Sequence, residues 1–243
     1  MLEGRKILMT NITHFAGMAA SQYLAEQGAT VACHDESFVD EEARRSFENE
    51  VTGAIALTGQ KPADIVTEAI EACGHIDVLV NNDSFPAIRA KVEDASLDDM
   101  RAGLEAMVVA PFALSGAVVP HFKARGAGKI LFLTSATAFV GLPNYSMYVT
   151  ARAAANGLAI SLAKELAREN IQVNAIAPNF VENPDYFPAD LLADEATYAK
   201  ITKNIPLGRL GRPEEIAATI AFYASDKSDF ITGHVLPFAG GWA

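Results

Sequence analysis

A serine, a tyrosine and an arginine stand at a spacing that suits proton transfer. Ser135 follows an apolar run, Tyr148 lies 13 residues further on, and Arg152 follows Tyr148 by four residues. Residues four apart on a helix share one face, so the Arg152 guanidinium can approach the Tyr148 phenol. Nearby Tyr145 has Val149 at the same offset and therefore has no cation beside it.

An arginine beside a phenol favours the phenolate, because an opposite charge within ~4–6 Å stabilises the ionised form of an acid. Arginine itself stays protonated at physiological pH and is a poor proton donor. A phenolate can remove a proton from a bound hydroxyl, and the Ser135 side chain can hold that hydroxyl in place. Each residue alone is typical of ordinary packing, but the joint spacing S-x12-Y-x3-R predicts acid–base catalysis by Ser135, Tyr148 and Arg152.

The elements that must position these residues alternate between short apolar runs and longer amphipathic stretches. Fully apolar strands alternating with helices are typical of a parallel sheet covered on both faces. We expect one α/β domain over residues 1–243, with a doubly wound Rossmann-type sheet of about seven strands flanked by helices. The expected strands are Lys6–Met9, Thr30–Cys33, Ala54–Ala56, Asp77–Val80, Lys129–Leu133, Ile171–Ile176 and His234–Phe238, and the expected helices are Ala16–Gln27, Pro62–Ala72, Ser96–Lys123, Tyr148–Glu169 and Pro213–Ala224.

The amino-acid composition and net charge limit the kinds of partner that the protein is expected to bind. Half of the residues are hydrophobic, and the net charge is −11, which argues against binding to nucleic acid or to an anionic membrane. The longest nearly apolar run, Ala106–Pro120, is shorter than the ~20 residues that span a bilayer, so we expect no membrane helix. The N-terminus has no secretory pattern, which favours a cytoplasmic location. The expected partner is a small molecule.

Neither the cysteines nor the histidines indicate a metal site. Cys33 and Cys73 have no C-x-x-C spacing, and the five histidines show no ligand spacing. The sequence therefore predicts neither a disulfide nor a bound metal.

The first turn lacks the glycines that a dinucleotide site needs. In the stretch Thr10–Gly17, Asn11 and Phe15 stand where glycines let cofactor phosphates approach the helix. A benzyl group there would fill the space of the pyrophosphate or the nicotinamide ribose, so we expect no cofactor. Asp35, at the end of the second strand, suits an adenosine ribose only weakly and is better interpreted as a solvated acid.

A long segment over residues 179–202 mixes prolines, aromatics and acids between a strand and the last large helix. Ligands of open α/β sheets bind at the carboxyl ends of the strands, where such a loop commonly covers them. We interpret the segment as a substrate lid, with a packed surface excursion as the alternative.

The whole chain resembles the short-chain dehydrogenases/reductases, but it departs from them at their cofactor and catalytic positions. Their Y-x3-K lysine is Arg152 here, their glycine-rich first turn holds Asn11 and Phe15, and Met107 replaces a further catalytic asparagine. The shared motifs are NNDS at Asn81–Ser84, the Ser135 and Tyr148 pair, Pro178-Asn179 and AGGW at Ala239–Trp242. These departures are similar to the marks of one group, the halohydrin dehalogenases, T-x4-[FY]-x-G and S-x12-Y-x3-R.

This resemblance implies conversion of vicinal haloalcohols to epoxides without a cofactor, and the reverse opening of epoxides by halide, azide, cyanide or nitrite. Ser135 would bind the hydroxyl, Tyr148 would deprotonate it, and Arg152 would stabilise the phenolate while the alkoxide displaces halide. Phe15 and the turn Pro178, Asn179, Phe180 and Val181 would enclose the halide, with the amides of Phe180 and Val181 as donors.

The resemblance also implies further roles. Asp83 would relay the released proton toward solvent, and small residues on the helix from Tyr148 are consistent with the family's homotetramer, a dimer of dimers. Trp242 would reach a neighbouring subunit's site. The expected pocket liners are Phe85, Pro86, Phe139, Leu142, Tyr186, Phe187 and Trp242.

Two other functions remain open. A nicotinamide-dependent oxidoreductase with a modified turn would bind NAD(P)H tightly, and both Phe15 and Arg152 argue against that function. A non-catalytic sensor would leave the joint presence of Ser135, Tyr148 and Arg152 unexplained.

Overall fold

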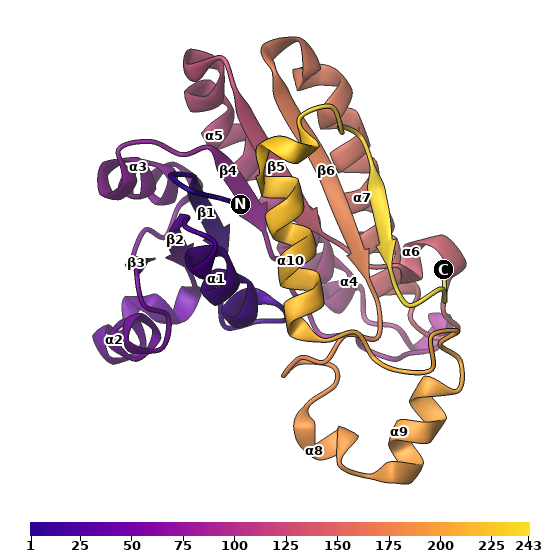
Figure 1. The fold of residues 1–243 in the computed structure, drawn as a ribbon. Coiled ribbons are helices and arrows are strands. Elements are labelled where there is room, and N and C mark those ends of the chain that lie inside the picture. Colours follow the sequence, from indigo (N-terminus) through magenta and orange to yellow (C-terminus); the bar gives the residue numbers. More distant parts are fainter.

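A single sheet of seven parallel strands forms the centre of the protein. The computed structural model describes all residues from 1 to 243. The strand order is β3-β2-β1-β4-β5-β6-β7, so the chain reverses its direction of winding between β1 and β4 (Figure 1). The strands are β1 (Lys6–Thr10), β2 (Thr30–His34), β3 (Ala54–Leu57), β4 (Val78–Asn81), β5 (Gly128–Leu133), β6 (Ile171–Pro178) and β7 (Val235–Phe238). The predicted fold class is confirmed.

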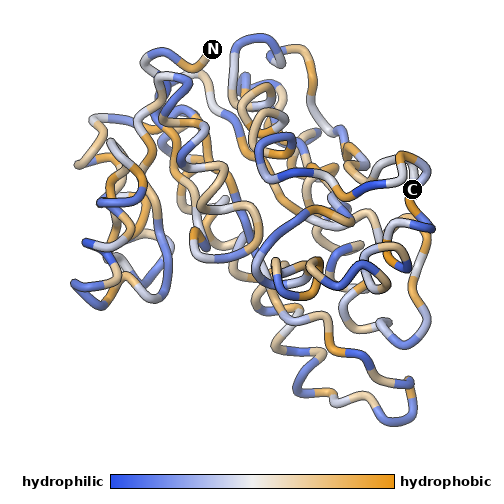
Figure 2. The backbone as a smooth tube through the Cα atoms, turned by 60° about the horizontal axis from the view of Figure 1, so that its bottom comes forward, coloured by the Kyte–Doolittle hydropathy of each residue, from blue (hydrophilic) through white to orange (hydrophobic).

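Helices cover both faces of the sheet, each over its own apolar cluster. One face is covered by α1 (Gly17–Glu26) and α10 (Pro213–Ala224), which pack against each other. The opposite face is covered by α3 (Pro62–Cys73), α5 (Ala110–Arg125) and α7 (Ser146–Leu166). Hydrophobic and hydrophilic residues alternate along the helical turns (Figure 2), as expected where one side of a helix faces the core.

The helix before β5 follows the predicted range Ser96–Lys123 closely. It runs without a break from α4 (Leu97–Leu104) through a π-helical turn (Glu105–Val109) into α5. By length and composition alone its 29 residues could cross a membrane, whereas the nearly apolar run Ala106–Pro120 within it is too short to do so. In the fold, Leu114, Val118 and Phe122 pack into the core, as they do in a core helix of a layered α/β protein.

Shorter helices complete the chain. Besides α2 (Glu41–Glu50) and α6 (Thr137–Val140), the segment over residues 179–202 carries α8 (Ala189–Leu192) and α9 (Glu195–Thr202). These two helices lie beyond the carboxyl ends of the strands, at the bottom of Figure 1. Their place is the one expected of a lid.

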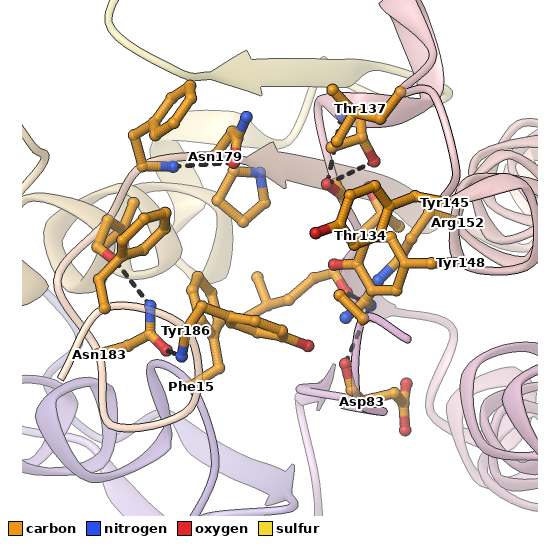
Figure 3. A pocket seen from close by; sticks show the side chains of 18 residues that line it. Phe15, Asp83, Thr134, Thr137, Tyr145, Tyr148, Arg152, Asn179, Asn183 and Tyr186 are labelled. Atoms are coloured by element: carbon orange, nitrogen blue, oxygen red, sulfur yellow. Dashed lines mark hydrogen bonds between the residues drawn. The ribbon is translucent and has the colours of Figure 1, made fainter. Parts of the chain in front are cut away.

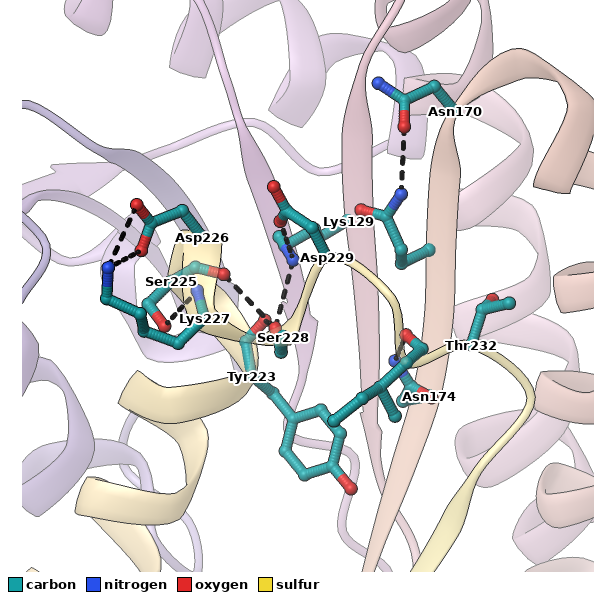
Figure 4. Close-up of polar contacts among 12 residues, drawn as sticks. Lys129, Asn170, Asn174, Tyr223, Ser225, Asp226, Lys227, Ser228, Asp229 and Thr232 are labelled. Carbon is teal, nitrogen blue, oxygen red and sulfur yellow. Dashed lines mark hydrogen bonds and ion pairs between the residues drawn. The ribbon is translucent and has the colours of Figure 1, made fainter.

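A buried lysine ties the sheet together at the end opposite the lid. The Lys129 ammonium lies 2.8 Å from a carboxylate oxygen of Asp229 and donates to the Ser228 hydroxyl at 3.0 Å (Figure 4). Burial lowers the pKa of Lys129, and Asp229 opposes that shift. The contacts fix the start of β5 against the loop that precedes β7.

Candidate active site

A cavity of about 290 Å³ opens at the carboxyl ends of the central strands (Figure 3). Residues at the ends of four strands line this cavity. Phe15 follows β1, Asp83 follows β4, Ser135 follows β5 and Pro178 is the last residue of β6. Because parallel strands end at the same edge of a sheet, residues distant in sequence meet here. Tyr148 and Arg152 enter from the first turns of α7.

Arg152 lies buried against the ring of Tyr148. Its guanidinium carbon is 5.1 Å from the ring centre, and its Nη1 donates to the backbone oxygens of Asp83 at 2.9 Å and Leu133 at 3.1 Å. Burial by itself lowers the pKa of Arg152, but the phenols of Tyr148 and Tyr186 outweigh burial and raise it. The buried Nε has no partner in the chain. A fixed positive charge therefore faces the Tyr148 phenol.

The Ser135 hydroxyl is oriented by the residue that begins α6. Its Oγ accepts from the backbone amide of Thr137 at 3.2 Å and from the Thr137 hydroxyl at 2.9 Å. A hydroxyl has one hydrogen and two acceptor positions. With both acceptor positions used, the hydrogen of Ser135 is left to donate to a molecule in the cavity.

Asp83 is a buried acid whose carboxylate contacts an amide side chain. Its Oδ1 accepts from Asn11 Nδ2 at 3.1 Å, whereas Arg152 contacts only its backbone oxygen. Burial raises the pKa of Asp83 to about 7, against the opposing charge of Arg152. Asp83 thus changes charge near neutral pH beside the proposed base.

The turn after β6 has an unusual backbone. Phe180 has a φ of 56°, and its amide donates to the Asn179 side chain at 3.0 Å. The amide of Val181 donates no hydrogen bond within the chain. Phe15, opposite this turn, also has a positive φ of 43°. Of the two amides expected to hold an anion, that of Val181 is therefore free and that of Phe180 is occupied.

Most of the expected site residues meet in this cavity. Its lining includes the following members of that set: Phe15, Asp83, Ser135, Leu142, Tyr148, Arg152, Pro178, Asn179, Phe180, Val181, Tyr186 and Phe187. Sequence reasoning missed six more liners: Ala87, Leu133, Thr134, Thr137, Tyr145 and Asn183. Thr134 and Thr137 flank Ser135, and Tyr145 lies three residues before Tyr148, so a search around the motif would have found them. No motif marks Asn183.

Four expected liners lie elsewhere. Phe85 and Pro86 line a separate small recess on another side of Tyr148, and Phe139 is 49% exposed. Trp242 packs edge-on against Phe180 of its own chain, with ring centres 5.4 Å apart. Phe85, Pro86 and Trp242 thus adjoin the cavity residues without lining the cavity.

Asp35 is not a free acid at the end of β2. Its two carboxylate oxygens accept hydrogen bonds from the backbone amides and hydroxyls of Thr13 and Ser37, and its side chain is buried. The expectation of a solvated acid was wrong, because Asp35 organises the first turn.

Comparison with known proteins shows the family to which the chain belongs. A profile of the family described as enoyl-(acyl carrier protein) reductase matches residues 16–243. The 3-oxoacyl-(acyl-carrier-protein) reductase of Thermotoga maritima is 32% identical over 99% of this chain and 98% of its own.

Two solved structures resemble the chain more closely. A protein described as a dehalogenation enzyme is 52% identical, with a TM-score of 0.98 and full coverage of both chains. A halohydrin dehalogenase bound to ethyl (2S)-oxiran-2-ylacetate is 38% identical, with a TM-score of 0.93, over 97% of this chain and 96% of its own. The chain belongs to the short-chain dehydrogenase/reductase superfamily, and within it is similar to the halohydrin dehalogenases.

Proposed function

We propose that the protein converts vicinal haloalcohols to epoxides, releasing halide and a proton, and opens epoxides with small anions in reverse. The observation that carries this proposal is the pairing of Tyr148 with a buried arginine, opposite a turn with an unpaired amide. The reaction needs a base for a hydroxyl and a binding site for an anion, and we assign these roles to Tyr148 and to the Val181 amide, since both residues line one cavity.

The proton chemistry follows from the side chains. Ser135 donates its hydrogen bond to the substrate oxygen, and the Tyr148 phenolate removes the hydroxyl proton. The resulting alkoxide attacks the neighbouring carbon, the carbon–oxygen bond forms, and the halide leaves with the bonding electrons. Because attacker and leaving group belong to one molecule, the protein contributes deprotonation, alignment and charge stabilisation.

The proposed halide site is inferred from the residues that line the cavity. Phe15, Phe180 and Phe187 line the cavity with aromatic carbon, and the Val181 amide supplies a hydrogen-bond donor. An apolar enclosure with an oriented amide suits a large, weakly hydrated anion such as chloride or bromide. The similar halohydrin dehalogenase is bound to ethyl (2S)-oxiran-2-ylacetate, an epoxide and therefore a product of the same class of reaction.

Asp83 is the proposed exit for the proton. Its carboxyl group is buried beside Arg152 and has a pKa of about 7, so it can take up and release a proton near neutral pH. The homotetramer and the reach of Trp242 into a neighbouring site stay predictions.

The test is chloride release from 1,3-dichloro-2-propanol by purified protein without nucleotide. Wild type is expected to release chloride, and Tyr148→Phe, which keeps the ring but loses the phenol, is expected to release none above background. Tyr145→Phe is the matched control, since that phenol has no cation at its side.

The competing function is nicotinamide-dependent oxidoreduction, as the names of the sequence relatives suggest. Saturable binding of NADH or NADPH, together with no halide release from several chloro- and bromoalcohols, would favour that function and contradict the proposal.

A further inference from the structure

A carboxylate from the lid is seated on the first turn of the fold. Asp185 Oδ2 accepts a hydrogen bond from the backbone amide of Phe15 at 2.7 Å, and its Oδ1 lies 3.2 Å from His14 Nδ1. The Asp185 side chain is 24% exposed. These are contacts between segments about 170 residues apart in the chain.

The seat of this carboxylate is the start of α1. The helix begins at Gly17, has no acidic residue in its first turn and has no side-chain cap. Helix N-terminal ends favour a negative charge, and the first turn of a Rossmann fold normally places a cofactor phosphate there. Asp185 supplies the missing negative charge from the protein's own lid.

The same segment of the lid also makes hydrogen bonds to the turn after β6, which is proposed to bind halide. The buried Asn183 accepts from the amides of Asp185 at 3.0 Å and Tyr186 at 2.8 Å, and its own Nδ2 donates to the Val181 oxygen at 2.6 Å. Tyr186 donates to the backbone oxygen of Phe85 at 3.0 Å. Residues 183–186 of the lid therefore make hydrogen bonds to the first turn, to the turn after β6 and to the loop that follows β4.

Asp185 is thus placed to govern the shape of the cavity without entering it. Its side chain does not line the cavity, but the amide that it holds belongs to Phe15, whose ring does. The Tyr186 ring lies 6.5 Å from that of Phe15 and 6.4 Å from that of Tyr148, measured between centres. A shift of residues 183–186 would therefore displace Phe15 and Tyr186, which both line the cavity.

We propose that Asp185 is a positioning residue that fastens the lid to the first turn, with its carboxylate in the role that a cofactor phosphate has in the nucleotide-binding relatives. The fastening closes the former nucleotide site with an internal anion and holds Phe15 opposite the Val181 amide. The consequence for halide binding rests on the proposed function, whereas the fastening itself does not.

The fastening is tested by amide hydrogen exchange at Phe15 in ligand-free protein. Asp185→Ala removes acceptor and charge, and Asp185→Asn keeps an oxygen acceptor but loses the charge. Asp190→Asn, on the exposed first turn of α8, is the control within the same lid. Exchange at Phe15 is expected to be slowest in wild type and the control, faster in Asp185→Asn, and about tenfold or more faster in Asp185→Ala.

The consequence for halide is tested by bromide titration, followed by the fluorescence of Trp242, the only tryptophan in the chain. Bromide is expected to bind Asp185→Ala about tenfold more weakly than wild type, which corresponds to about 1.4 kcal/mol. The KM for the haloalcohol should rise more than kcat falls, because the base and its arginine are untouched.

Unchanged exchange at Phe15 in Asp185→Ala, with an unchanged thermal midpoint, would overturn the proposal. Faster exchange with unchanged bromide affinity would overturn its second half, the control of the halide site. If wild type releases no halide from any haloalcohol, the proposed function fails, but the exchange experiment still decides whether Asp185 fastens the lid.

Discussion

Removal of the Arg152 charge is the perturbation whose size follows most directly from the structure. The guanidinium carbon lies 5.1 Å from the centre of the Tyr148 ring, and both groups face the cavity. At that separation, and with an effective dielectric constant of about 20, two unit charges attract by about 3 kcal/mol. If the negative charge that develops on the phenol during proton transfer lies at a similar distance, Arg152→Gln should slow chloride release by about two powers of ten.

The assay is the initial rate of chloride release between pH 6 and 10 for wild type, Arg152→Gln and Arg152→Lys. The deficit of Arg152→Gln should shrink as pH rises, because hydroxide can then take the substrate's proton in place of the weakened side-chain base. Arg152→Lys keeps the charge but loses part of the contact with the oxygens of Asp83 and Leu133. It should stay within about tenfold of wild type in rate, at a cost in thermal stability.

A deficit of less than about threefold for Arg152→Gln would refute this electrostatic reasoning, since the calculated attraction is far larger. So would a deficit that is the same at every pH, because the arginine would then act through structure alone. Thermal unfolding of each variant separates those effects from simple loss of fold.

Three further predictions concern Thr137 and Asp83. Thr137→Val should lower kcat/KM about tenfold by removing a hydrogen bond to Ser135, and Thr137→Ser should restore it. Asp83 has a pKa of about 7, so the ratio of wild-type to Asp83→Asn rates should rise as pH increases through 7. The raised pKa means that the folded state binds this proton more tightly than the unfolded state. Stability in urea should therefore fall by up to about 4 kcal/mol in wild type, but not in Asp83→Asn, as pH rises from about 4 to 7.

The strands were predictable because their composition follows from their environment. Runs such as Ile130–Leu133 are buried on both faces of a parallel sheet, so every position is apolar and the pattern is plain in the sequence. By contrast α2 was missed, since six of the ten residues in its sequence EEARRSFENE are charged and only Phe47 is buried. A helix with one buried side chain leaves little periodicity to detect.

The proposed catalytic trio was predictable because local rules fix the positions of its members. Ser135 follows a strand, and the helical offset of four residues brings Arg152 to Tyr148. The turn after β6 was predictable only in part. Its residues line the cavity as expected, but the side chain of Asn179 takes the Phe180 amide, and a choice between such alternative hydrogen bonds leaves no mark in the sequence.

The hydrogen bonds made by the lid could not be predicted from the sequence. Asn183 and Asp185 matter through segments far along the chain, and no spacing rule connects Asp185 to Phe15. The π-helical turn around Met107 was missed for a different reason. One extra residue within a helical turn shifts the pattern too little to be seen, although such turns often mark functional sites.

The central claim is that one cavity removes a proton and accepts a halide within a single substrate, without nucleotide. The most direct measurement is the yield of chloride and epoxide, quantified together, from 1,3-dichloro-2-propanol and purified protein in nucleotide-free buffer. We expect equal amounts of chloride and epoxide from wild type, and neither product from Tyr148→Phe. Chloride without epoxide, or turnover that survives in Tyr148→Phe, would contradict the claim.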